Sequence, residues 1–73
     1  MKLTDREVNV MTEAMLVYGG SFAQKLAHLM RVADSTNLQR LIDAFPDFVS
    51  KYGPETHFYR EVCRDRLIQP EEC

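Results

Sequence analysis

Apolar residues recur at spacings of three and four along most of this 73-residue chain. This period is typical of helices with one buried face, and the alternating pattern typical of strands is almost absent. The pattern predicts helices over residues 5–18, 22–33, 37–52 and 54–66. We therefore expect an all-α fold, a compact bundle of four short helices within a single domain, residues 1–73.

Capping residues precede three of the predicted helices. A serine or threonine followed three residues later by glutamate or glutamine forms a capping box, in which the two side chains satisfy free backbone amides. This spacing occurs in the pairs Thr4–Glu7, Ser21–Gln24 and Thr36–Gln39. Gly19 and Gly20 follow the first helix, where a glycine in the left-handed conformation is expected to end it.

Pro46 lies inside the predicted third helix. A proline ring clashes with the preceding helical turn, so we expect a kink or a break there. The apolar stripe keeps its phase on both sides, so both halves can face one core. Pro54 follows Gly53 and is predicted to be the first residue of the last helix. We expect residues 1–3 and 69–73 to fray.

Large apolar side chains on one face of each later helix are predicted to form the core. These residues are Phe22, Leu26, Leu29, Met30, Leu38, Leu41, Ile42, Phe45, Phe48, Val49, Phe58 and Val62.

The first predicted helix differs, because its apolar residues cover about half of its circumference instead of a narrow stripe. One interpretation is a central helix enclosed by the others. The other is that part of this surface meets another protein or a second copy, for which adaptable methionines are suited. On the second interpretation the contact residues are Met11, Met15, Leu16 and Tyr18.

The outward face of the last helix carries Arg60 and Arg64. Arginine is enriched among the residues that dominate protein interfaces, so we add both to the predicted partner-binding residues. The alternative interpretation is an ordinary solvated charged face.

Charge and length narrow the classes of function. Nine Lys and Arg oppose eleven Asp and Glu, a net charge of −2, which disfavours a nucleic-acid partner. No apolar run approaches the ~20 residues that cross a bilayer, so we expect no membrane association. Charged residues begin at Lys2 with no signal sequence, and we expect a cytoplasmic protein. A domain this small is marginally stable, which favours self-association as a homodimer.

The residues that carry chemistry form no recognisable constellation. Cys63 and Cys73 provide no disulfide framework and are expected to be reduced thiols. Together with His28 and His57 they make four potential zinc ligands, but the chain lacks a C-x2-C pair. We therefore predict no catalytic residue, no metal and no cofactor, and expect that the protein is not an enzyme.

Residues 18–52 contain the pattern GGSF…AD…N…FP…Y. In this pattern the chain resembles small uncharacterised proteins of phages, plasmids and other mobile elements. The resemblance implies a context in which small acidic proteins act as stoichiometric inhibitors of host proteins, and it assigns no site residue.

These observations together predict a small non-enzymatic protein-interaction module that also self-associates. The alternative function is a helix-turn-helix-like DNA-binding regulator. Its recognition helix would be residues 37–45, where Arg40 is the single positive charge, although phosphate binding usually involves several.

Overall fold

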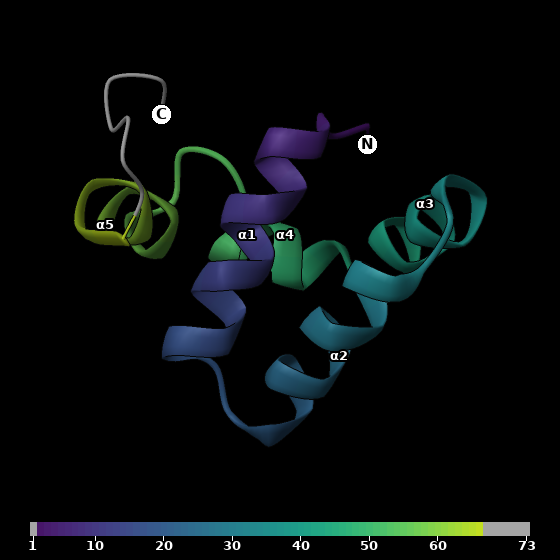
Figure 1. Ribbon diagram of the computed structural model, residues 1–73, viewed down its shortest axis with the longest axis horizontal. Helices are drawn as coiled ribbons and strands as arrows, with labels where there is room; N and C mark the ends of the chain where they lie inside the picture. The colour runs from purple at the N-terminus through teal and green to yellow at the C-terminus, as the bar shows by residue number, and fades with distance from the viewer. Residues whose placement is uncertain (1, 67–73) are drawn as a thin grey trace.

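The computed structural model describes residues 2–66, which form five α-helices and no strand (Figure 1). The all-α prediction is confirmed, but four helices is the wrong number, because the predicted third helix is divided in two. The helices are α1 (Asp5–Tyr18), α2 (Ser21–Val32), α3 (Ser35–Ala44), α4 (Pro46–Tyr52) and α5 (His57–Arg66). No helix in the described part of the chain has the length and apolar character needed to span a membrane.

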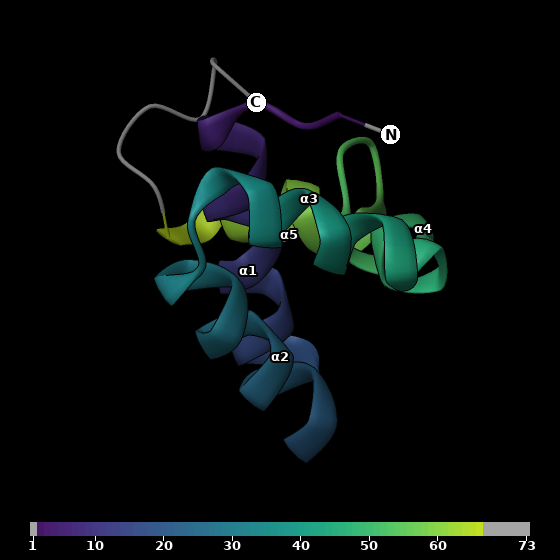
Figure 2. The ribbon, with the colours of Figure 1, turned by 90° about the vertical axis from the view of Figure 1, so that its right-hand side faces the viewer.

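Pro46 causes a complete break between α3 and α4 (Figure 2). Phe45, the residue between them, has non-helical dihedral angles of φ −127° and ψ 62°. Pro46 then occupies the first turn of α4, a position where its missing N–H costs nothing, because that amide has no partner within a helix. Of the two predicted outcomes, a kink or a break, the break is confirmed.

Helix α1 is the centre of the fold. It contacts α2, α4 and α5, and Figure 1 shows it between α2 on one side and α5 on the other. Its buried residues are Val8, Val10, Met11, Thr12, Ala14 and Met15. The interpretation of the first helix as a central element is therefore confirmed for residues 8–15, whereas Val17 and Tyr18 in its last turn are exposed.

A polar contact ties α2 to α1. The Thr12 hydroxyl is buried and donates a hydrogen bond of 2.8 Å to the Val8 carbonyl oxygen. The same hydroxyl oxygen accepts a hydrogen bond of 3.0 Å from Arg31 Nε on α2. Arg31 Nη2 also pairs with the Glu13 carboxylate at 3.1 Å. Arg31 thus bridges two successive residues of α1, which limits sliding between the two helices.

Six aromatic rings connect the remaining helices. The centroids of neighbouring rings in this series are between 4.7 and 6.1 Å apart, which is within the range of favourable aromatic pairs. In spatial order the rings belong to Tyr18, Phe58, Tyr52, Phe48, Phe45 and Phe22. This aromatic chain links the end of α1 to α5 and α4 and then to the start of α2.

The first predicted capping box is confirmed. The Thr4 hydroxyl accepts from the Glu7 amide at 3.1 Å, and the Glu7 carboxylate accepts from the Thr4 amide at 2.9 Å. The second box, Ser21–Gln24, is wrong. Gly20 is the N-cap of α2, so Ser21 is already helical, and Gln24 Nε2 donates instead to the Gly19 carbonyl at 3.2 Å.

The third predicted box, Thr36–Gln39, is also wrong. Asp34 caps α3, and its Oδ1 accepts from the Asn37 amide at 2.8 Å. A carboxylate two residues upstream therefore starts the helix earlier than predicted. Thr36 lies within the first turn, and Gln39 donates to the Asp43 carboxylate at 2.9 Å.

The prediction that Pro54 begins the last helix is wrong as well. The chain turns through residues 53–56, with Glu55 at a positive φ of 71°. The Thr56 hydroxyl accepts from the Tyr59 amide at 3.3 Å, and α5 begins directly after Thr56. Threonine satisfies a free amide of the first turn, which proline cannot do, and this decides where the helix starts.

The predicted core is correct for the residues nearest the centre and wrong for the outer face of α2. Leu26, Met30, Ile42, Val49 and Val62 are buried, and Leu38, Leu41, Phe45, Phe48 and Phe58 are partly buried against the core. Phe22 and Leu29 are exposed. The reason is that α2 packs through an arc centred on two alanines, Ala23 and Ala27, which turns these two large side chains outward.

Further predictions concerned the two ends of the chain and the state of its cysteines. Leu3, which belongs to the segment predicted to fray, packs against the core. Cys63 is buried and disulfide-bonded, so the expectation of a reduced thiol is wrong at this residue. Cys73, and with it the predicted fraying of residues 69–73, lies outside the described residues.

We predict that serine has opposite effects at the two adjacent glycines. A Cβ at Gly19 would lie 2.5 Å from the Ala23 Cβ and 2.5 Å from the Met15 carbonyl oxygen, whereas a Cβ at Gly20 meets nothing within 4 Å. Gly19→Ser should lower the free energy of unfolding by about 1–3 kcal/mol through overpacking. Gly20→Ser should raise it by a few tenths of a kcal/mol, because serine adds an N-cap oxygen. Urea unfolding of both variants tests this, and equal changes would contradict it.

Candidate protein-binding surface

The outward face of α2 exposes three large apolar side chains. Phe22, Leu29 and Val32 are 59%, 51% and 80% exposed. Their spacings of seven and three place them along one side of the helix. Scattered apolar residues are normal on a protein surface, but an aligned set on one helix is a feature of interaction sites.

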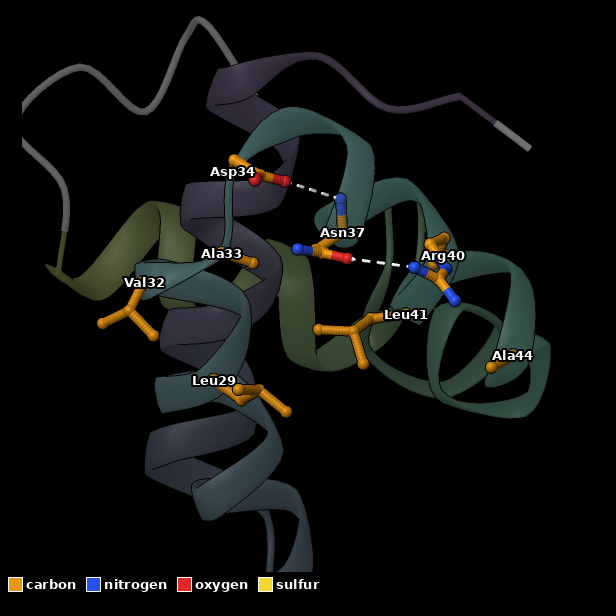
Figure 3. A pocket seen from close by; sticks show the side chains of 8 residues that line it. All are labelled: Leu29, Val32, Ala33, Asp34, Asn37, Arg40, Leu41 and Ala44. Atoms are coloured by element: carbon orange, nitrogen blue, oxygen red, sulfur yellow. Dashed lines mark hydrogen bonds between the residues drawn. The ribbon is translucent and has the colours of Figure 1, made fainter.

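Next to this face lies an open groove of about 760 Å³ between α2 and α3 (Figure 3). Leu29 from α2 and Leu41 from α3 contribute to its two walls. The lining residues are Leu29, Val32, Ala33, Asp34, Asn37, Arg40, Leu41 and Ala44. The groove therefore continues the exposed apolar face of α2 onto a second helix.

The groove exists because α3 packs loosely against the rest of the protein. Ile42 is the one fully buried residue of α3, although this helix is strongly amphipathic. The two linking residues, Ala33 and Asp34, are both extended, and Asp34 caps α3 immediately afterwards. The short extended turn carries α3 away from α2 and leaves Leu41 only partly covered.

Polar groups at the edge of the groove are partly engaged with one another. Asn37 connects Asp34 and Arg40. Its backbone N–H donates to Asp34 Oδ1, and its side-chain oxygen accepts from Arg40 Nη1 at 3.4 Å. Within the described residues, Arg40 forms no ion pair. The groove thus combines apolar walls with a rim that carries an unneutralised guanidinium group.

The four contact residues predicted on the first helix differ in their exposure to solvent. Met11 and Met15 lie inside the core at 1% and 0% exposure, so the expectation that they form a partner surface is corrected. Leu16 is half-buried against the core. Tyr18 is 41% exposed, but its ring stacks on Phe58 at a centroid distance of 4.7 Å. Helices α2, α4 and α5 cover the apolar residues of α1 up to Met15, whereas Val17 and Tyr18 in its last turn remain exposed.

Arg60 and Arg64 are exposed on α5, on the far side of α1 from α3 (Figure 1). Arg64 pairs with Glu61 at 2.7 Å and with Asp65 at 3.4 Å. These hydrogen bonds and charges raise the pKa of Arg64. Neither arginine lines the groove, whereas Tyr18 stacks on Phe58 of the helix that carries both arginines.

Sequence reasoning missed the groove residues Leu29, Val32 and Leu41 as a surface. Their helical spacing was visible, but the same spacing equally indicates a core face. The distinguishing signal was the pair Ala23 and Ala27 on the opposite side of α2, since small residues permit the closest approach of a neighbouring helix.

The groups whose pKa is shifted, Tyr59 and Arg64, do not line the groove. Burial raises the pKa of Tyr59, and the nearby Glu7 carboxylate raises it further, but Tyr59 lies on α5. Among residues 2–66 no three or more His, Cys, Asp or Glu side chains are grouped to hold a metal ion.

Comparisons with known proteins provide no relative from which a role could be transferred. No family model matches the chain, and neither curated proteins nor solved structures include a match. Evidence about function therefore comes from the surface itself.

We predict that alanine substitutions at two leucines of α2 have unequal effects on stability, because Leu26 is buried in the core and Leu29 is exposed. Leu26→Ala should lower the free energy of unfolding by about 2–5 kcal/mol, because it opens a cavity beside α1. Leu29→Ala should cost less than about 1 kcal/mol, because this side chain is already half exposed to water. Thermal unfolding monitored by circular dichroism distinguishes the two, and a larger loss for Leu29→Ala would refute the position of α2.

We also predict that Tyr59 makes the protein sensitive to alkali. Its folded-state pKa is raised, so its contribution to stability is complete below the unfolded pKa near 10 and disappears as pH rises through the folded value. Tyr59→Phe should flatten the alkaline decline in the free energy of unfolding. An identical pH profile for wild type and Tyr59→Phe would contradict the prediction.

Proposed function

We propose that this protein is a small non-enzymatic protein-binding module and that the α2–α3 groove is its binding surface. The observation that carries the proposal is the aligned exposure of Phe22, Leu29 and Val32 beside a groove of about 760 Å³. An apolar face next to a concave surface with a few polar groups is typical of a binding site.

Energetics support the same function. Complete burial of a leucine, valine or phenylalanine side chain stabilises an assembly by about 1.5–3 kcal/mol, relative to leaving it exposed. Leu29 and Val32 are both at least half exposed, and Leu41 is partly exposed across the groove. A partner that covers all three therefore gains hydrophobic free energy that the isolated domain does not realise.

A DNA-binding regulator is a weaker second candidate. The close succession of α2 and α3 resembles a helix-turn-helix, in which α3 would enter the major groove. However, α3 contains one cation, Arg40, together with Asp43, and Asp34 caps the N-terminal end that a recognition helix presents to bases. Large apolar side chains on the adjacent face of α2 also suit a protein surface better than a phosphate backbone.

The homodimer prediction loses one of its two supports, because Met11 and Met15 lie in the core. Its other support, the small size of the domain, is unchanged. Stoichiometric inhibition of a host protein, implied by the resemblance to mobile-element proteins, remains compatible with a binding module. Inhibition of this kind needs a binding surface and no catalytic group.

Site-specific photocrosslinking in the native host tests the proposal. A benzophenone amino acid at Val32 should form a covalent adduct of defined mass with another protein, and Leu29→Ser should reduce this adduct. The same probe at Asp65, which is exposed on α5, is the matched control and should give none. Adducts of equal yield from both positions, or none from Val32, would overturn the proposal.

A binding assay with duplex DNA tests the second candidate. We expect no retention of the purified protein at moderate salt. Binding that weakens steeply as salt increases, and that Arg40→Ala abolishes, would instead favour the regulator.

A further inference from the structure

The charges around the groove identify the chemistry of its occupant. Helix α2 carries Lys25, His28 and Arg31 and has no acidic residue, although the whole chain has a net charge of −2. Arg31 is engaged with Glu13 on α1, but neither Lys25 nor Arg40 forms an ion pair within residues 2–66. Lys25 lies on the exposed apolar face of α2, and Arg40 lines the groove on α3.

The acidic groups near these cations are already hydrogen-bonded. The Asp34 carboxylate caps α3, where it is also favoured by the helix dipole. The Asp43 carboxylate accepts a hydrogen bond from Gln39. The Asp34 carboxylate keeps its charge and lines the groove together with Arg40. Neither Lys25 nor Arg40 forms an ion pair within residues 2–66, so an acidic group of a partner can pair with each cation.

This charge pattern distinguishes between possible occupants. A second copy that paired through the same face would add a second Lys25 and a second Arg40 to the interface and no acidic side chain from α2, which is unfavourable. A nucleic acid would meet the cations but would leave Leu29 and Val32 against polar backbone. A segment that combines apolar and acidic residues satisfies both features of the surface.

The form of the groove favours a helical segment. An amphipathic helix binds between two helices by placing apolar anchors at spacings of three, four and seven residues. Leu29, Val32 and Leu41 supply apolar contacts from both walls, and the small side chains Ala33 and Ala44 leave space for bulky anchors. An acidic face of such a helix would meet Arg40, which lines the groove, and Lys25, which is exposed one helical turn before Leu29 on α2.

We propose that the α2–α3 groove binds an acidic amphipathic helix of another protein, whose apolar face covers Leu29, Val32 and Leu41 and whose carboxylates pair with Lys25 and Arg40. This inference rests on the proposed function, since it names the kind of partner that the same surface accepts.

Two synthetic peptides of about 14 residues test the inference, because this length forms one short helix. Both have leucines at helical spacing, one with glutamates and the other with lysines at the flanking positions. Fluorescence anisotropy measures their affinity, and methyl NMR shifts of Leu29, Val32 and Leu41 locate the binding site. The glutamate peptide should bind about ten-fold more tightly at low salt, with a smaller difference at high salt.

Variants of the protein complete the experiment. The double variant Lys25→Glu, Arg40→Glu should reverse the preference, because both positions are exposed and the apolar walls are unchanged. Leu29→Ser should weaken both peptides. Circular dichroism checks that each variant keeps its helices, so that a loss of binding reports on the groove.

The other outcomes separate this inference from the proposed function. Equal affinity for the two peptides, or tighter binding of the lysine peptide, overturns the acidic partner and leaves the groove as a protein-binding site. Failure of both peptides to bind, while the Val32 photocrosslink persists in the host, also overturns the acidic helix and keeps the binding module. Failure of both peptides and of the photocrosslink overturns both.

Discussion

The rest of the structure depends on which side of α2 packs against α1. Ala23 and Ala27 form the middle of the contacting arc, and the absence of a side chain at Gly19 makes room for Ala23 at the junction. The hydrogen bond from Arg31 to the buried Thr12 hydroxyl maintains the same register. Because small residues occupy the contact, the large apolar side chains Phe22 and Leu29 are turned toward solvent.

The aromatic chain holds the short helices together, as a larger hydrophobic core does in a longer protein. A domain of this size buries little surface, and α4 and α5 are short. Ring-to-ring contacts from Tyr18 through Phe48 to Phe22 hold these helices to the junction between α1 and α2. Helix α3 lies outside most of this network, which explains why its apolar face remains only partly covered beside the groove.

Function follows from this unequal packing. Helices α1, α2, α4 and α5 pack closely together, and the loosely packed α3 leaves the apolar groove open beside α2 (Figures 1 and 3). A binding surface on a supported helix needs less ordering when a partner arrives, which reduces the entropic cost of association. On the proposed function, the cations Lys25 and Arg40 would then select among partners by charge.

The sequence by itself determined the all-α class, the Thr4–Glu7 cap and the interruption at Pro46, because each depends on residues close together in the chain. Helix starts at residues 21, 35 and 57 were misplaced by one to three positions, since several capping side chains competed and only the folded geometry selected one. The division of α2 into a buried alanine face and an exposed face of Phe22, Leu29 and Val32 was decided by the tertiary structure. Hydrophobic periodicity shows that a helix has apolar sides, but which side is buried depends on how closely a neighbouring helix can approach it.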